Sequence, residues 1–111
     1  MNALTGPASV VERQLTAYND HDLESFTDTY AEDVCITYPD GSLLQGRQAV
    51  REAYAGQFTE GRCHAEVTGR LTEGDWVVDH ETAHGIAAEP LRVLVAYRIR
   101  GGRIDRVEFL G

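Results

Sequence analysis

The chain contains no lysine, because all ten of its basic residues are arginines. A lysine Schiff base, whether to a carbonyl substrate or to pyridoxal phosphate, is therefore excluded within these 111 residues. A P-loop is excluded for the same reason, since that phosphate-binding loop needs its lysine.

Cysteine and serine motifs are also scarce. Cys35 and Cys63 are too few for a disulfide scaffold or a zinc site, so we expect two free thiols. The sequence has neither a Gly-x-Ser-x-Gly motif nor a Gly-x-Gly-x-x-Gly motif after a predicted strand. We therefore expect no cofactor.

Positive charge is in the minority, with 18 acidic against 10 basic residues and a net charge of -8. This balance disfavours nucleic acid and anionic membrane surfaces as partners. No apolar run approaches the ~20 residues that cross a bilayer, and the N-terminus lacks the pattern of a signal peptide. We expect a cytoplasmic protein with one domain over residues 1–111.

Helical signals come first along the chain. Ser9–Glu12 has the spacing of a capping box behind Pro7, and Asp22 is an N-cap candidate for a second helix. A third helix is predicted from Arg47 to about Phe58. The expected apolar faces are Val11, Leu15 and Tyr18; Leu23, Phe26 and Tyr30; and Val50, Tyr54 and Phe58.

Strand signals follow. A short β-branched segment from Val34 to Tyr38 ends at the turn sequence Pro39–Gly41. From His64 the apolar pattern changes to period two, which predicts strands over 64–72, 76–85, 91–100 and 103–110. Helices first and an antiparallel meander second predict an α+β fold.

The order of five motifs resembles the nuclear transport factor 2-like superfamily, above all its SnoaL-like polyketide cyclases and ketosteroid isomerase. The motifs are Tyr18–Leu23, Tyr30–Val34, Pro39–Gly41, Gly46–Glu52, and Gly102–Ile104 with Phe109. This resemblance implies a cone-shaped, cystatin-like roll of three helices on a curved antiparallel sheet. It also implies an apolar pocket between the helices and the concave sheet face, and frequent homodimers.

The residues of ketosteroid isomerase are not carried over. The position of its aspartate general base holds Tyr38, and the positions of its oxyanion donors hold Gln14 and Val95. We therefore do not expect the isomerase mechanism in this chain.

Alternation along the strand from Trp76 decides which side chains reach the pocket. Asp79 and Glu81 would be costly in a core, so we expect the set containing Val78, His80 and His84 on the concave face. The next two strands would contribute Val93, Val95, Tyr97 and Ile99, and then Asp105, Val107 and Phe109. The residues expected to line the pocket are Gln14, Tyr30, Tyr38, Tyr54, Phe58, Val78, His84, Val95, Val107 and Phe109.

His80 is the first candidate for proton transfer, with Tyr18 or Tyr97 holding a substrate oxygen. The alternatives for His80 are a ligand-binding or a purely structural histidine. Asp40 is a candidate displaced base or an ordinary turn aspartate. His80 and His84 would lie about 13 Å apart along a strand, which is too far for a shared zinc ion.

The opposite sheet face carries Arg92, Leu94, Ala96, Arg98 and Arg100. We expect Arg98 to pair with Asp79 there. This face is either solvated or a two-fold interface, and the resemblance favours a homodimer.

Two functions fit these patterns. The first is an acid–base isomerase, cyclase, dehydratase or hydrolase that acts on a small apolar carbonyl compound. The alternative is a non-catalytic module for ligand binding or dimerisation.

Overall fold

A computed structural model describes residues 6–111. The helices are α1 (Pro7–Asn19), α2 (Leu23–Asp28) and α3 (Arg47–Glu60). The strands are β1 (Tyr30–Thr37), β2 (Leu43–Gln45), β3 (His64–Glu73), β4 (Trp76–His84), β5 (Leu91–Arg100) and β6 (Arg103–Phe109). No helix among residues 6–111 is both long enough and apolar enough to cross a membrane.

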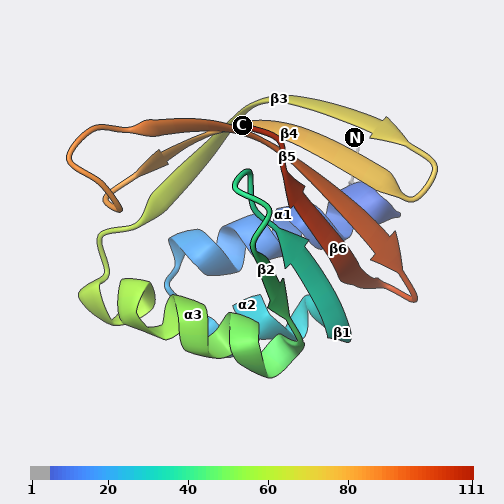
Figure 1. Cartoon of the computed structure of the whole chain (residues 1–111), viewed down its shortest axis with the longest axis horizontal. Coiled ribbons are helices and arrows are strands. Elements are labelled where there is room, and N and C mark those ends of the chain that lie inside the picture. The colour runs from blue at the N-terminus through green and yellow to red at the C-terminus, as the bar shows by residue number, and fades with distance from the viewer. Residues whose placement is uncertain (1–5) are drawn as a thin grey trace, which may run out of the picture.

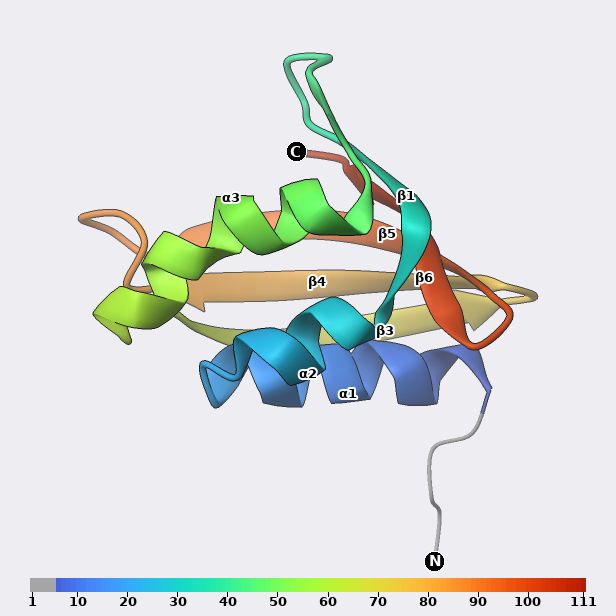
Figure 2. The ribbon, with the colours of Figure 1, turned by 90° about the horizontal axis from the view of Figure 1, so that it is seen from below.

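In the described part of the chain, six strands form one mixed sheet in the order β2-β1-β6-β5-β4-β3. β1 runs parallel to β6, and every other neighbouring pair is antiparallel. The sheet curves over the three helices, which all lie on its concave side (Figures 1 and 2). This arrangement confirms the predicted α+β roll of helices on a curved sheet.

The helix ends show which local signals are used. Pro7 occupies the start of α1, but Ser9 donates to the carbonyl of Gly6 at 2.7 Å, so the predicted capping box does not form. Asp22 caps α2 as predicted, accepting from the backbone N–H of Ser25 at 3.1 Å. Gly61 ends α3 with φ of +69°, a conformation that favours glycine.

The last four strands lie where the period-two pattern predicts them. β1 begins four residues earlier than predicted, so Tyr30 belongs to a strand and not to the second helix. Its ring still packs edge-on against Phe26, with centroids 5.2 Å apart. The short strand β2 lacks a periodic pattern, and pairing with β1 creates it.

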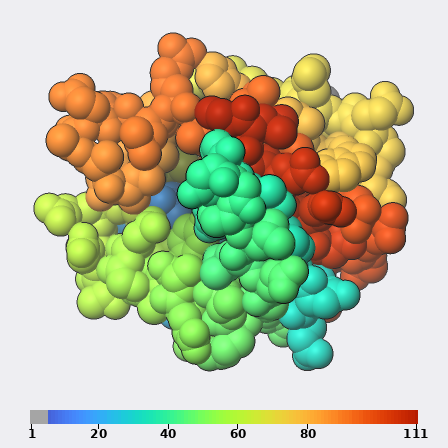
Figure 3. Space-filling model, viewed as in Figure 1, coloured from blue at the N-terminus to red at the C-terminus, as the bar shows by residue number. Residues whose placement is uncertain are grey.

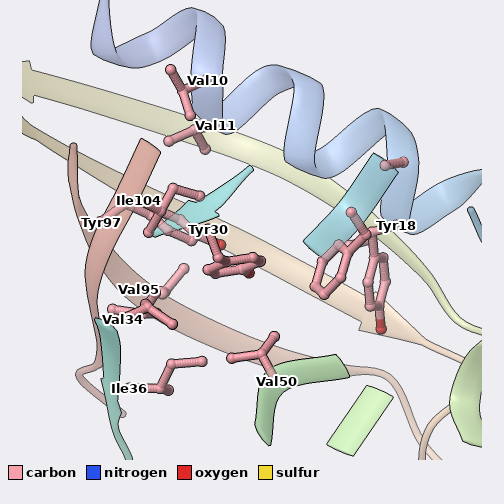
Figure 4. Close-up of a cluster of buried hydrophobic side chains, with 14 of the residues drawn as sticks. Val10, Val11, Tyr18, Tyr30, Val34, Ile36, Val50, Val95, Tyr97 and Ile104 are labelled. Carbon is pink, nitrogen blue, oxygen red and sulfur yellow. The ribbon is translucent and has the colours of Figure 1, made fainter. Parts of the chain in front are cut away.

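The core fills the space between the concave sheet face and the helices. Figure 4 shows Tyr18, Tyr30 and Tyr97 among aliphatic side chains from both layers. Phe26 is completely buried and has Tyr18, Tyr30, Tyr54 and Phe58 as aromatic neighbours. Aromatic pairs in such tilted and edge-on arrangements each contribute about 0.5–1.5 kcal/mol beyond their buried area.

Candidate functional site

The inward face of β4 carries Val77, Asp79, Glu81 and Ala83. Val77 and Asp79 are completely buried, while Glu81 and Ala83 line a cavity beneath the sheet. Because alternate residues of a strand point to opposite faces, Val78 and the histidines lie on the other face. The predicted orientation of this strand is therefore wrong.

Asp79 can be buried because its charge is compensated. Arg70 on β3 donates two hydrogen bonds to its carboxylate, at 2.7 and 2.9 Å, and a third to Glu12 of α1 at 2.8 Å. A buried carboxylate is tolerated when it is paired and fully hydrogen-bonded. The pairing predicted between Asp79 and Arg98 is wrong, because Arg98 binds Asp105 with two hydrogen bonds of 3.0 Å.

Asp105 is displaced from the predicted pocket face by an irregularity in the β5–β6 register. Arg98 pairs with Arg106, whereas the next residue, Ile99, pairs with Ile104. One residue of β6 is therefore extra, which is the pattern of a β-bulge. The bulge turns Asp105 toward Arg98, away from the cavity.

The outer face of the sheet holds both histidines of β4. His80 has Thr68 at 3.2 Å and Arg92 at 3.4 Å as side-chain partners, and His84 has Glu66 at 2.9 Å. Neither histidine lines the cavity. The homodimer predicted through this face stays a prediction.

The cavity has a volume of about 120 Å³ and lies between β4, β5, β6 and the helices α1 and α3. Its wall consists of Gln14, Leu15, Tyr18, Tyr30, Ile36, Tyr54, Gln57, Ala65, Glu81, Ala83, Ile86, Leu91, Val93, Tyr97, Val107 and Phe109. A hollow opens between the orange segment that joins β4 to β5, the green helix α3 and the teal β1–β2 hairpin (Figure 3). Blue atoms of α1 are visible at its bottom.

The predicted lining residues divide into two groups. Those that line the cavity are Gln14, Tyr18, Tyr30, Tyr54, Tyr97, Val107 and Phe109. Phe58 and Val95 belong instead to the packed core, and Tyr38 stacks on Phe109 with ring centroids 5.4 Å apart. Asp40 is exposed and accepts from both the N–H and the hydroxyl of Ser42, which makes it a turn residue.

Among the described residues that line the cavity, Glu81 is the one with an acidic side chain, and none is basic. The hydroxyl of Tyr97 donates to its Oε2 at 2.8 Å. Burial raises the pKa of Glu81 to about 7, since removal from water disfavours the carboxylate. The Tyr97 hydrogen bond and Arg70 lower this pKa, whereas the charge of Asp79 raises it.

Phenol and amide groups surround this carboxyl. Gln14 Nε2 donates to the Tyr30 hydroxyl at 3.0 Å, and the Tyr18 hydroxyl donates to Gln57 Oε1 at 3.2 Å. Burial raises the pKa values of Tyr18, Tyr30, Tyr54 and Tyr97. These phenols therefore remain protonated near neutral pH and act as hydrogen-bond donors.

Sequence reasoning missed Glu81, although a signal for it exists. The hairpin loop Gly74–Asp75 sets a register in which Arg70 lies opposite Asp79. A cross-strand pair of opposite charge can be buried together, so Asp79 can face the core. Because Glu81 lies two residues further along the strand, it shares that face and also points inward.

Solved structures share this architecture. An uncharacterized cystatin-fold protein from Novosphingobium aromaticivorans is 22% identical, with a TM-score of 0.84 over 97% of this chain and 100% of that one. A computationally designed 17-OHP binder is 20% identical, with a TM-score of 0.83 over 96% and 94% of the two chains. SalBIII, an epoxide hydrolase/cyclase-like enzyme in pyran ring formation in salinomycin, is 16% identical, with a TM-score of 0.82 over 93% and 88%.

A comparison with curated proteins gave no match. Residues 11–107 match the SnoaL-like domain, which spans most of the helices and the sheet. The chain therefore belongs to the SnoaL-like domain family.

Proposed function

We propose that the protein is a cofactor-independent enzyme that moves a proton on a small, largely apolar carbonyl compound. Glu81 takes and returns that proton. The observation that carries the proposal is the placement of this carboxyl inside the cavity with a pKa of about 7. A proton-transfer group works best when its pKa lies near the working pH.

The reaction begins when the Glu81 carboxylate removes a proton from the carbon next to the carbonyl. The electron pair of the broken C–H bond forms a C=C bond, and the carbonyl π electrons move to oxygen to give an enolate. Protonated Glu81 then returns its proton to the same carbon or to a conjugated one. Return to a different carbon is an isomerisation, and the balance needs no oxidant or cofactor.

Tyr97 positions the base. Its hydroxyl is buried and bonded to one carboxyl oxygen of Glu81, which leaves the other oxygen for the substrate. The apolar walls on β5 and β6 keep water away from this pair.

Support from related proteins concerns the reaction class. SalBIII, which has the same fold, is an epoxide hydrolase/cyclase-like enzyme. Cyclisation, dehydration and hydrolysis each need a group that exchanges a proton near neutral pH, as Glu81 does. Isomerase, cyclase, dehydratase and hydrolase chemistry are all compatible with this site.

Proton exchange measures this chemistry without a known substrate. The wild-type protein and Glu81→Gln are incubated in D2O with a panel of small enolisable ketones, and NMR follows loss of the α-protons. We expect exchange above the buffer rate in the wild type and at the buffer rate in Glu81→Gln. Glu66→Gln, the same change at an exposed carboxylate on β3, serves as the matched control. Wild-type exchange no faster than Glu81→Gln for every ketone would overturn the proposal.

The second candidate function is ligand binding without turnover. The 2.8 Å bond between Tyr97 and Glu81 favours it, since a neutral carboxylic acid held in this way can simply recognise a polar group. The designed 17-OHP binder has the same fold. Saturable binding of a ketone by NMR with no exchange of its α-protons would select this function.

A further inference from the structure

We propose that Gln14 and Tyr30 together bind the carbonyl oxygen of the ligand, and that this ligand is an uncharged compound of about one six-membered ring. The role of the oxygen site in turnover rests on the proposed function of Glu81. The binding assignment stands on the hydrogen-bond pattern, the charge and the size of the cavity.

Among the described residues, the wall has free donors at Tyr54 and at the Gln57 amide, but only Gln14 and Tyr30 are hydrogen-bonded to each other with a spare donor on each. Tyr97 donates its proton to Glu81, and Tyr18 donates its proton to Gln57. Tyr30 instead accepts from Gln14, so its own O–H remains available, and Gln14 Nε2 keeps a second N–H. Tyr18 and Tyr97, the expected oxygen-binding residues, are thus already committed to other partners.

A spare donor remains in both orientations of the Gln14 amide. If the amide is turned over, Tyr30 donates to Oε1 and the whole NH2 group of Gln14 is free. Both residues are buried and line the cavity. A buried donor without a partner carries a desolvation cost of about 1–3 kcal/mol, which an acceptor oxygen removes.

The charge of the wall selects an uncharged ligand. Within residues 6–111, no arginine or histidine lines the cavity, and Glu81 is its one carboxylic acid. A carboxylate or phosphate ligand would meet Glu81 without a cationic side chain in the wall to bind it, in a chain whose net charge is -8.

The volume selects a small ligand. The cavity measures about 120 Å³. For comparison, an engineered apolar cavity of about 150 Å³ binds benzene. This volume matches one ring with a carbonyl group and is too small to enclose a fused polycyclic skeleton.

Cyclohexanone is the probe, and methylenecyclohexane is its matched control, because it has the same shape without an acceptor oxygen. Binding of each to the wild type, Tyr30→Phe and Tyr38→Phe is measured by NMR titration. Tyr38 packs on Phe109 outside the cavity wall, so Tyr38→Phe removes a phenol that the ligand does not reach. We expect Tyr30→Phe to weaken cyclohexanone binding about 5-fold through loss of one hydrogen bond, and to leave methylenecyclohexane unchanged.

Several results would overturn the assignment. One is equal affinity of cyclohexanone for the wild type and Tyr30→Phe. Another is a loss that appears in Tyr54→Phe and not in Tyr30→Phe, since Tyr54 supplies another phenol to the wall. Cyclohexanecarboxylate that binds more tightly than cyclohexanone would overturn the uncharged class.

The wild type provides a readout that needs no folded variant. The side-chain NH2 resonances of Gln14 should shift with cyclohexanone and not with methylenecyclohexane, and identical shifts with both probes would overturn the oxygen site. These binding measurements are independent of turnover. If Tyr30→Phe binds cyclohexanone more weakly but the wild type shows no proton exchange, the oxygen site is supported and the enzymatic proposal fails. If the wild type shows proton exchange and Tyr30→Phe keeps the same exchange rate and affinity, the enzymatic proposal is supported and the oxygen site fails.

Discussion

Arg70 and Asp79 face each other across β3 and β4 and form an ion pair with two hydrogen bonds, of 2.7 and 2.9 Å. Asp79 is completely buried, whereas the Arg70 side chain keeps 18% of its surface exposed. Arg70 also reaches Glu12, so the pair ties helix α1 to the sheet. This pair fixes the orientation of β4 and thereby turns Glu81 into the cavity.

Arg70→Met should strongly destabilise the protein. The substitution leaves the Asp79 carboxylate buried without a partner, and removal of one member of a buried ion pair costs about 3–5 kcal/mol. Urea unfolding at pH 7 measures the free energy of unfolding. Arg62→Met is the matched control, because the Arg62–Glu60 pair is 75% and 63% exposed and such pairs contribute about 0–1 kcal/mol. Equal losses in the two variants would contradict a structural role for the buried pair.

Local patterns predict most of the fold correctly. Period two located β3 to β6, and the helical spacing located α3, because both patterns report one-sided burial. The spacing of residues 26 and 30 predicts a helical Tyr30, but Tyr30 lies in β1, whose hydrogen bonds to β6 come from far away in sequence. The strand β2 depends entirely on such pairing and leaves no local signal.

The site was harder to predict than the fold. The resemblance places Gln14 in the pocket, and fold and spacing place the tyrosines there, but the strand pattern favours His80 over Glu81 as the base. Burial of the β4 carboxylates is predicted to be costly only when Arg70, the partner of Asp79 on the neighbouring strand, is left out of account. One-residue errors of this kind exchange the two faces of a strand completely.

Glu81 makes the protein less stable as the pH rises. Its pKa is about 7 in the folded protein against an ordinary value of 4.5. Between these values the folded state holds a proton that the unfolded state has released, so the free energy of unfolding falls by about 1.4 kcal/mol per pH unit. The stabilisation is complete below about pH 4.5 and is lost above about pH 7, a total of roughly 3 kcal/mol.

Glu81→Gln should remove this dependence. Urea unfolding of both proteins between pH 4.5 and 8 gives the difference between their free energies of unfolding. The contributions of the exposed carboxyl groups are the same in both proteins and cancel in this difference. The wild type should lose stability relative to Glu81→Gln as the pH rises through this range. A constant difference would show that the folded protein does not raise the pKa of Glu81.

Tyr97→Phe should raise the pKa of Glu81 above about 7. The Tyr97 hydrogen bond favours the carboxylate and is a cause that lowers this pKa, so its removal shifts the pKa upward. NMR titration of the Glu81 side-chain carboxyl carbon reports the value directly. Tyr38→Phe provides the comparison, because Tyr38 makes no hydrogen bond to Glu81. An unchanged or lower pKa in Tyr97→Phe would exclude Tyr97 as the donor.

His80→Gln should leave proton exchange on ketones unchanged. His80 lies on the outer sheet face with Thr68 and Arg92, on the side of β4 away from the cavity. The proton-exchange rate of His80→Gln is compared with the rates of the wild type and Glu81→Gln in the same D2O assay. Exchange lost in His80→Gln and retained in Glu81→Gln would restore the histidine as the proton-transfer group.

Gly85→Ala should destabilise the protein at the mouth of the cavity. Gly85 has φ of +80°, and an added Cβ would overlap with the carbonyl group of Arg62. Both the backbone conformation and the overlap are unfavourable, so we expect a loss of roughly 2–4 kcal/mol in urea unfolding. Because Ile86 follows directly and lines the cavity, cyclohexanone should also bind more weakly.

Gly56→Ala is the matched control for this change. Gly56 lies within α3, and nothing surrounds the position of its Cβ within 4 Å. Alanine is favoured over glycine inside a helix by about 1 kcal/mol, so Gly56→Ala should stabilise the protein. Destabilisation of the same size in both variants would mean that the close approach between Gly85 and Arg62 does not shape the mouth.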